Sequence, residues 1–262
     1  MSDELENQAI IEEEAPMQMI EEADPELEAM FKAGVHFGYS RSRRHPKMAP
    51  FMFGLRHNVE VFDLEKVRFQ LTQALAVITE MSKKGEVLLF VGTKPAVQTI
   101  IEEAAQKIQM PFTTDRWIGG LLTNFHVMRK RMDYFEQMKE AKRSGEFSKY
   151  KKKEIVMKEK ELERLEHNFR GVVSLKKRPT ALFVIDPKEE ITAVREAKRI
   201  SLPVIAVANN DVDPGLTNYI IPANDSARSS VSYILEKVVE AWREGKKQAV
   251  SEDAPEVANI AA

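Results

Sequence analysis

Short apolar runs alternate with amphipathic stretches over most of the chain. Five runs have the length and β-branched content of strands, namely residues 59–62, 87–91, 181–185, 204–208 and 219–221. Residues 88–91 and 182–185 are apolar at every position, as a strand that is covered on both faces requires. The pattern therefore predicts a parallel sheet buried between helices.

Amphipathic helices are predicted between and after these strands, because apolar residues recur there at three- and four-residue steps. Asp225 and Ser226 precede the last of these helices, where an N-cap is expected. The alternation of strands and helices predicts an α/β fold of three layers, in which helices flank both faces of a flavodoxin- or Rossmann-like parallel sheet. The predicted core positions of the helices are Val67, Leu71, Leu75, Ile78, Val97, Ile100, Ile101, Ala104, Ile108, Ile191, Val194, Ala197, Ile200, Val231, Ile234, Leu235, Val238 and Trp242.

Residues 125–175 interrupt the alternation with two longer amphipathic stretches, which a polar turn at 143–146 separates. They predict an inserted antiparallel coiled-coil hairpin. The α/β domain then comprises residues 29–124 and 176–247. The apolar positions of the hairpin are Phe125, Met128, Met132, Phe135 and Met138, followed by Ile155, Leu162, Leu165, Phe169 and Val172.

Charge is distributed unevenly along the chain. Fourteen of the 41 acidic residues lie in 1–30 and 251–262, so residues 31–250 carry all 39 Lys and Arg with 27 acids, a net charge of +12. The acidic ends, 1–28 and 248–262, are predicted to be disordered. Residues 126–178 contain 17 Lys or Arg and nine acidic residues. A cationic body with a basic hairpin indicates a polyanionic partner, and solvated charged faces are the alternative interpretation.

Composition excludes several function classes. The chain has no cysteine, so disulfides and thiolate metal sites are impossible, and a reducing cytoplasm is expected. No apolar run is long enough for a membrane span, and no signal-peptide pattern is present. The five histidines have no paired ligand spacing, so no metal, and no other cofactor, is expected.

Two loops that follow predicted strands are candidate ligand sites. Residues 92–95 read Gly-Thr-Lys-Pro, and Lys94 could receive a phosphate of an RNA or of a small ligand. The motif is neither a Walker loop nor a dinucleotide loop, so a tight turn at Gly92 is the favoured interpretation. Asp211 and Asp213 could bind a cation, but a turn with Asx hydrogen bonds is favoured. No nucleophile motif is present, and catalysis is not predicted.

Residues 32–58 combine basic side chains with aromatics and glycines. Arginine and histidine among aromatic residues are typical of surfaces that bind RNA phosphates and stack on bases. Phe51 and Phe53 are expected in the core, which leaves the arginines for phosphates. The RNA-binding candidates of the whole chain are Lys32, Arg41, Arg43, Arg44, Lys47, Arg56, Lys94, Arg116, Asn124, Arg129, Lys130, Lys151, Lys152 and Lys153.

Several motifs, in their order along residues 29–247, resemble the bacterial type of the small-subunit ribosomal protein S2 family. The most specific is Arg-Trp-Ile-Gly-Gly-Leu-Leu-Thr-Asn at 116–124, directly before the hairpin. Others are Lys-Ala-Gly-Val-His-Phe-Gly at 32–38, His-Pro-Lys-Met at 45–48, Phe-Met-Phe-Gly at 51–54, Phe-Val-Gly-Thr-Lys at 90–94, the run 182–186, Asp-Pro at 213–214, and Ile-Pro at 221–222 with Asn-Asp at 224–225.

The resemblance implies a nucleotide-fold-like domain that no longer acts on a nucleotide. It would bind small-subunit ribosomal RNA and neighbouring ribosomal proteins in the cytoplasm, and would need no small-molecule substrate. The chain departs from the family pattern at Tyr39, Glu60 and Asn209-Asn210, where the family commonly has histidines and Asp-Thr. These departures argue against a histidine-dependent role there. The alternatives are a nucleotide- or sugar-phosphate-binding α/β enzyme and a protein scaffold that does not bind RNA.

Overall fold

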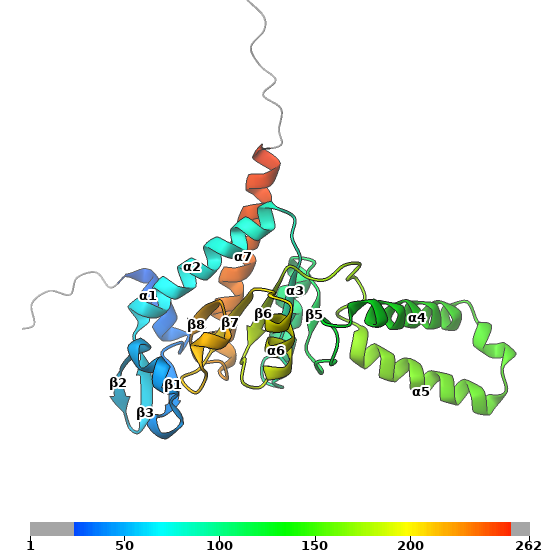
Figure 1. The fold of residues 1–262 in the computed structure, drawn as a ribbon, viewed down its shortest axis with the longest axis horizontal. Helices are drawn as coiled ribbons and strands as arrows, with labels where there is room; N and C mark the ends of the chain where they lie inside the picture. Colours follow the sequence, from blue (N-terminus) through cyan, green and yellow to red (C-terminus); the bar gives the residue numbers. More distant parts are fainter. Residues whose placement is uncertain (1–23, 253–262) are drawn as a thin grey trace, which may run out of the picture.

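A computed structural model of the chain describes residues 24–252 (Figure 1). Five parallel strands form the central sheet in the order β5-β4-β6-β7-β8. Four of them were predicted, whereas β5 consists of two residues and is too short to leave a hydrophobic pattern. The chain reverses its direction of winding between β4 and β6, as in flavodoxin-like sheets. The strands are β4 (Leu88–Val91), β5 (Phe112–Thr113), β6 (Ala181–Ile185), β7 (Val204–Ala208) and β8 (Tyr219–Pro222).

Helices cover both faces of this sheet, which confirms the predicted α/β fold. On one face, Leu88 and Phe90 pack in a core with residues of α2 (Leu64–Lys83), α3 (Gln98–Lys107) and α7 (Arg228–Glu252). On the other face, Leu89 and Val91 pack with residues of α6 (Ile191–Arg199). Successive strand residues thus enter different cores, which is why β4 and β6 are apolar throughout.

Helices α2 and α7 cross closely beside β8. A Cβ atom at Gly245 would lie 2.4 Å from the backbone oxygen of Thr79. Only glycine permits this approach of the two helices. The hydroxyl of Ser82 adds a hydrogen bond of 2.6 Å to the carbonyl of Trp242.

A second, antiparallel sheet with the order β1-β3-β2 precedes the central sheet. It corrects one prediction: residues 59–62 form a strand, but this strand does not join the parallel sheet. The turn between β2 and β3 has positive φ at His57 and Asn58, as a type I′ hairpin requires. Phe53 is 81% exposed, so its predicted place in the core was wrong, whereas Phe51 packs against the core. The elements of this N-terminal part are α1 (Pro25–Lys32), β1 (Phe37–Ser40), η1 (Arg41–Arg43), η2 (Pro46–Phe51), β2 (Met52–Arg56) and β3 (Val59–Phe62).

In the chain, two helices come between β5 and β6, and they extend away from the sheet (Figure 1). They are α4 (Phe125–Arg143) and α5 (Lys152–Phe169), joined by η3 (Glu146–Lys149), and we call residues 125–169 the arm. Buried side chains of both helices and of η3 join the core on the α6 side of the sheet. These side chains are Met128, Met132, Phe135, Met138, Phe147, Leu162, Leu165 and Phe169.

The chain ends differ from the predicted boundaries. Helix α1 begins at Pro25, inside the extension 1–28 that was predicted to be disordered, because Asp24 caps it by accepting from the amide of Glu26. Helix α7 continues to Glu252, past the predicted boundary at 248. The remainder of both predicted acidic ends, 1–23 and 253–262, lies outside the described residues.

Candidate functional site

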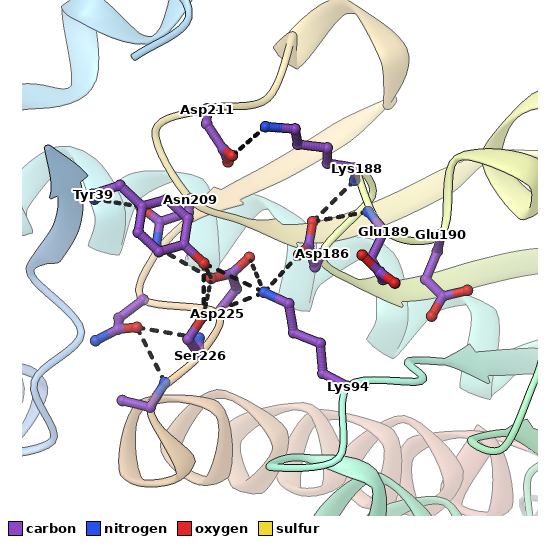
Figure 2. Close-up of polar contacts among 12 residues, drawn as sticks. Tyr39, Lys94, Asp186, Lys188, Glu189, Glu190, Asn209, Asp211, Asp225 and Ser226 are labelled. Carbon is purple, nitrogen blue, oxygen red and sulfur yellow. Dashed lines mark hydrogen bonds and ion pairs between the residues drawn. The ribbon is translucent and has the colours of Figure 1, made fainter. Parts of the chain in front are cut away.

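Four polar side chains meet at the carboxyl ends of the parallel strands (Figure 2). Lys94 follows β4, Asp186 follows β6, Asn209 follows β7 and Asp225 follows β8. This edge, where the winding direction changes, is the place where open α/β sheets bind their ligands. If the protein were an enzyme, its substrate would therefore be expected to bind at this cluster.

The ammonium group of Lys94 is held by two carboxylates. Its Nζ lies 2.5 Å from an oxygen of Asp186 and 3.0 Å from an oxygen of Asp225, and 3.2 Å from the Oγ of Ser226. The side chain of Asp225 is fully buried, and those of Asp186 and Lys94 are 10% and 20% exposed. The ammonium group that could have bound a phosphate is thus already neutralised by carboxylates of the protein.

The charges of this cluster are coupled. Burial by itself lowers the pKa of Lys94, but the carboxylates of Asp225 and Asp186 outweigh it, so the pKa lies above its ordinary value. Burial raises the pKa of Asp225, and the charge of Asp186 raises it further because one lysine serves two acids. Lys94 therefore holds its proton more tightly than a free lysine, and its charge stabilises the carboxylate of Asp225, which burial disfavours.

Tyr39 of β1 closes the cluster from the side of the N-terminal sheet. Its hydroxyl lies 2.7 Å from the Oγ of Ser226 and donates to Asp225 at 3.2 Å. Its amide donates at 3.1 Å to each of the side-chain oxygens of Asn209 and Asn210. Tyr39 thus links β1 to the loops that follow β7 and β8 at this edge of the sheet.

Asp225 does not cap α7 as predicted. Its carboxylate faces Lys94, and the side-chain oxygen of Asn224 instead accepts from the amides of Ser226 and Ala227. The preference for Asp at an N-cap was overridden here by a charged partner from the loop that follows β4.

The loop at 92–95 offers no anion site. The amide of Thr93 donates at 2.7 Å to Glu190, whose pKa burial raises above its usual value. Gly92 is not required for the predicted tight turn, since its φ is not positive. A Cβ atom there would lie 2.5 Å from the Cδ1 of Ile101, so the glycine permits close packing. These contacts argue against a phosphate loop.

The basic residues at 41–47 divide into two groups. Arg44 pairs at 2.8 Å with Glu60, whose side chain is 3% exposed, and Lys47 pairs at 2.9 Å with Asp213. Arg41 and Arg43 are exposed, and the guanidinium of Arg43 lies over the ring of Tyr39. Asp213 also accepts from the amide of Gly215, which confirms the predicted Asx turn.

One carboxylate organises the segment 116–124 before the arm. Glu196 of α6 accepts from the indole Nε1 of Trp117 at 3.1 Å, from the amide of Gly120 at 2.7 Å, and from the amide and hydroxyl of Thr123 at 3.2 and 3.1 Å. The amide of Leu122 is a further donor at 3.2 Å. Burial raises the pKa of Glu196, but these donors outweigh it and lower the pKa below its usual value. No sequence pattern singles out Glu196.

The remaining RNA-binding candidates lie at separate places. Arg129 is engaged internally, with Asp133, Glu136 and the carbonyls of Val173 and Leu175. Lys32 pairs with Glu28 on the exposed face of α1. Arg56 lies at the exposed end of β2, Arg116 and Asn124 are exposed before the arm, Lys130 is exposed on α4, and Lys151, Lys152 and Lys153 are exposed at the start of α5.

Within residues 24–252, no three His, Asp or Glu side chains gather as they would around a metal ion. The same part of the chain contains no helix with the length and hydropathy of a membrane span.

Comparison with known proteins gives a consistent result. The family model described as Ribosomal protein S2 matches residues 30–245. A protein of Dictyoglomus thermophilum is 39% identical over 84% of this chain and 89% of its own length, and one of Thermus thermophilus is 40% identical over 82% and 84%. A third, of Coprothermobacter proteolyticus, is 40% identical over 84% and 82%. All three bear the name small ribosomal subunit protein uS2.

Proposed function

Because the chain belongs to the ribosomal protein S2 family, we propose that it is a structural constituent of the small ribosomal subunit. In this role it binds small-subunit ribosomal RNA and neighbouring ribosomal proteins in the cytoplasm during translation. The observation that carries the proposal is the family match over 30–245, because it includes the sheet, the segment 116–124 and the arm together.

The geometry at the sheet edge supports a structural role over an enzymatic one. Lys94 is neutralised by Asp186 and Asp225, and the hydroxyl of Tyr39 donates to Asp225 at the same edge. Such an edge holds the N-terminal sheet on the central sheet, and this contact needs no cofactor. The S2 family is one of ribosomal structural proteins, so this chain is not an enzyme.

The parts of the chain that were predicted as separate domains have different roles in this proposal. We assign residues 29–124 and 176–247 to a body and 125–175, which include the arm, to a coiled-coil hairpin that reaches RNA or protein away from the body. Buried apolar side chains of α4 and α5 belong to the same hydrophobic core, which supports this assignment. The basic arm, and the net charge of +12 over residues 31–250, provide the attraction to RNA.

The candidates for RNA contact fall into two groups, according to whether an ion pair within the protein already neutralises their charge. Lys94, Arg129, Arg44 and Lys47 have internal ion-pair partners and serve mainly to hold the fold. The exposed candidates without such partners in the described part of the chain remain as the proposed contacts: Arg41, Arg43, Arg56, Arg116, Asn124, Lys130, Lys151, Lys152 and Lys153.

Changing Lys151, Lys152 and Lys153 together to alanine tests the tip of the arm. Each cation that neutralises an RNA phosphate contributes about −0.7 to −0.9 to the slope of log affinity against log salt concentration. We expect the slope to fall in magnitude by about 2 when binding to purified small-subunit RNA is titrated with salt. An unchanged slope would assign the contact to another part of the surface.

Sedimentation tests the function itself. The wild-type protein is expected to travel with small ribosomal subunits from a lysate and to be released at high salt. Failure to sediment with subunits, or retention at high salt with no loss, would contradict the proposal. Saturable stabilisation by a small phosphate compound would instead support the enzyme hypothesis.

A further inference from the structure

The charges of α4 are segregated around the helix. All its acidic residues, Asp133, Glu136 and Glu140, lie on one flank, where they pair with Arg129 and Arg143. At about 100° per residue, this flank covers an arc of roughly 60°. The apolar residues that pack against the core lie on a second side, at Met128, Met132 and Phe135.

Four side chains occupy another flank of the first three turns of α4. Val127, Lys130, Arg131 and Tyr134 follow the steps i, i+3, i+4 and i+7, which places them within an arc of roughly 100°. We call these four residues the α4 stripe. Val127 and Tyr134 are each 41% exposed, and Lys130 and Arg131 are exposed as well.

The two cations of the stripe have no acidic partner within residues 24–252, although the neighbouring Arg129 has two. Asp133 lies three residues after Lys130 but pairs with Arg129 instead, and Glu136 also pairs with Arg129. Such an arrangement leaves two positive charges beside an accessible aromatic ring. At 41% exposure, the ring of Tyr134 is accessible for stacking on a base.

We propose that the α4 stripe is an RNA-binding surface, on which Lys130 and Arg131 contact phosphates and Tyr134 stacks on an unpaired base. This inference rests on the proposed function and names a site for it. The partner is RNA, since two unpaired cations and an aromatic ring complement a polyanion with exposed bases. Arg129, predicted beside Lys130 as a contact, instead fixes α4 on the segment that follows α5 through the carbonyls of Val173 and Leu175.

The stripe makes two separable predictions for binding to purified small-subunit RNA by the full-length protein. The variant K130A/R131A should reduce the salt slope by about 1 for each cation removed, a loss of up to roughly 100-fold in affinity at about 0.1 M salt. The variant Y134A should weaken binding by about 5- to 100-fold with the slope unchanged, and Y134F should restore it.

Matched controls separate this surface from a general loss of charge. The variant K198A/R199A removes two exposed adjacent cations from the last turn of α6 and should reduce the salt slope less than K130A/R131A. Thermal unfolding of all variants checks that the fold is retained. If K130A/R131A does not fold, K130Q/R131Q replaces it.

The outcomes distinguish this inference from the proposed function. If the wild-type protein binds RNA with a salt-dependent affinity and K130A/R131A binds equally well, the proposed role of the α4 stripe is contradicted while the proposed function stands. If the wild-type protein does not bind at all, the function itself fails. A loss of co-purification with ribosomal proteins, together with unchanged RNA affinity, would overturn the stripe in favour of a protein partner.

Discussion

Replacing Lys94 by alanine is expected to destabilise the protein by about 3–5 kcal/mol, the cost of leaving buried charges without their partner. The carboxylates of Asp186 and Asp225 would then lie near each other with no cation between them. Urea unfolding, followed by far-ultraviolet circular dichroism, measures this loss as a lower midpoint with an unchanged slope.

The control is Lys188→Ala. Lys188 also pairs with an aspartate, Asp211, at 2.6 Å, but its side chain is 61% exposed, so the expected loss is below about 1 kcal/mol. Neutralising the acids in the triple variant K94A/D186N/D225N should recover part of the stability. If Lys94→Ala cost no more than Lys188→Ala, the cluster would not be a structural element of the fold.

Replacing Glu196 by alanine is expected to cost about 3 kcal/mol and to loosen the entry to the arm, because five donors of residues 117–123 would lose their acceptor. Each buried donor left unsatisfied costs about 1–3 kcal/mol, which water reduces at the half-buried ones. Hydrogen exchange should show the amides of Gly120, Leu122 and Thr123 opening faster than those of the central strands. Glu236→Ala, which removes an exposed acid from α7, should leave these amides protected.

The pH dependence gives Glu196 a second signature. Its folded-state pKa is lowered, so the unfolded chain takes up its proton first as the pH falls. Its contribution to stability is complete above the ordinary glutamate pKa and is lost as the pH falls through the lower, folded-state pKa. Glu196→Gln should remove this part of the acid sensitivity, measured as the midpoint of urea unfolding at pH values between about 6 and 3. Equal acid sensitivity of wild type and variant would contradict the assignment.

Most helices and strands followed from the sequence because their signals are local. Strands β4 and β6 are apolar at every position, and α2, α3, α6 and α7 bury one side, so period and length identify them without knowledge of the partners. The strands β1, β2 and β5 were missed since they are short or exposed, and β3 was placed in the wrong sheet. A four-residue pattern reveals a strand but not the edge with which it pairs.

By itself, the sequence determined a parallel α/β domain, an inserted pair of helices and a cationic surface, because periodicity and charge are properties of residues near in the chain. Only the tertiary structure decided which charges remain available. Lys94 meets Asp225 across 131 residues and Tyr39 meets Asn210 across 171, and these contacts turn a possible phosphate site into a closed one. Glu196 reaches 117–123 in the same way. The physical reason is that the energy of a charge depends on its neighbours in space, which the fold brings together from distant segments.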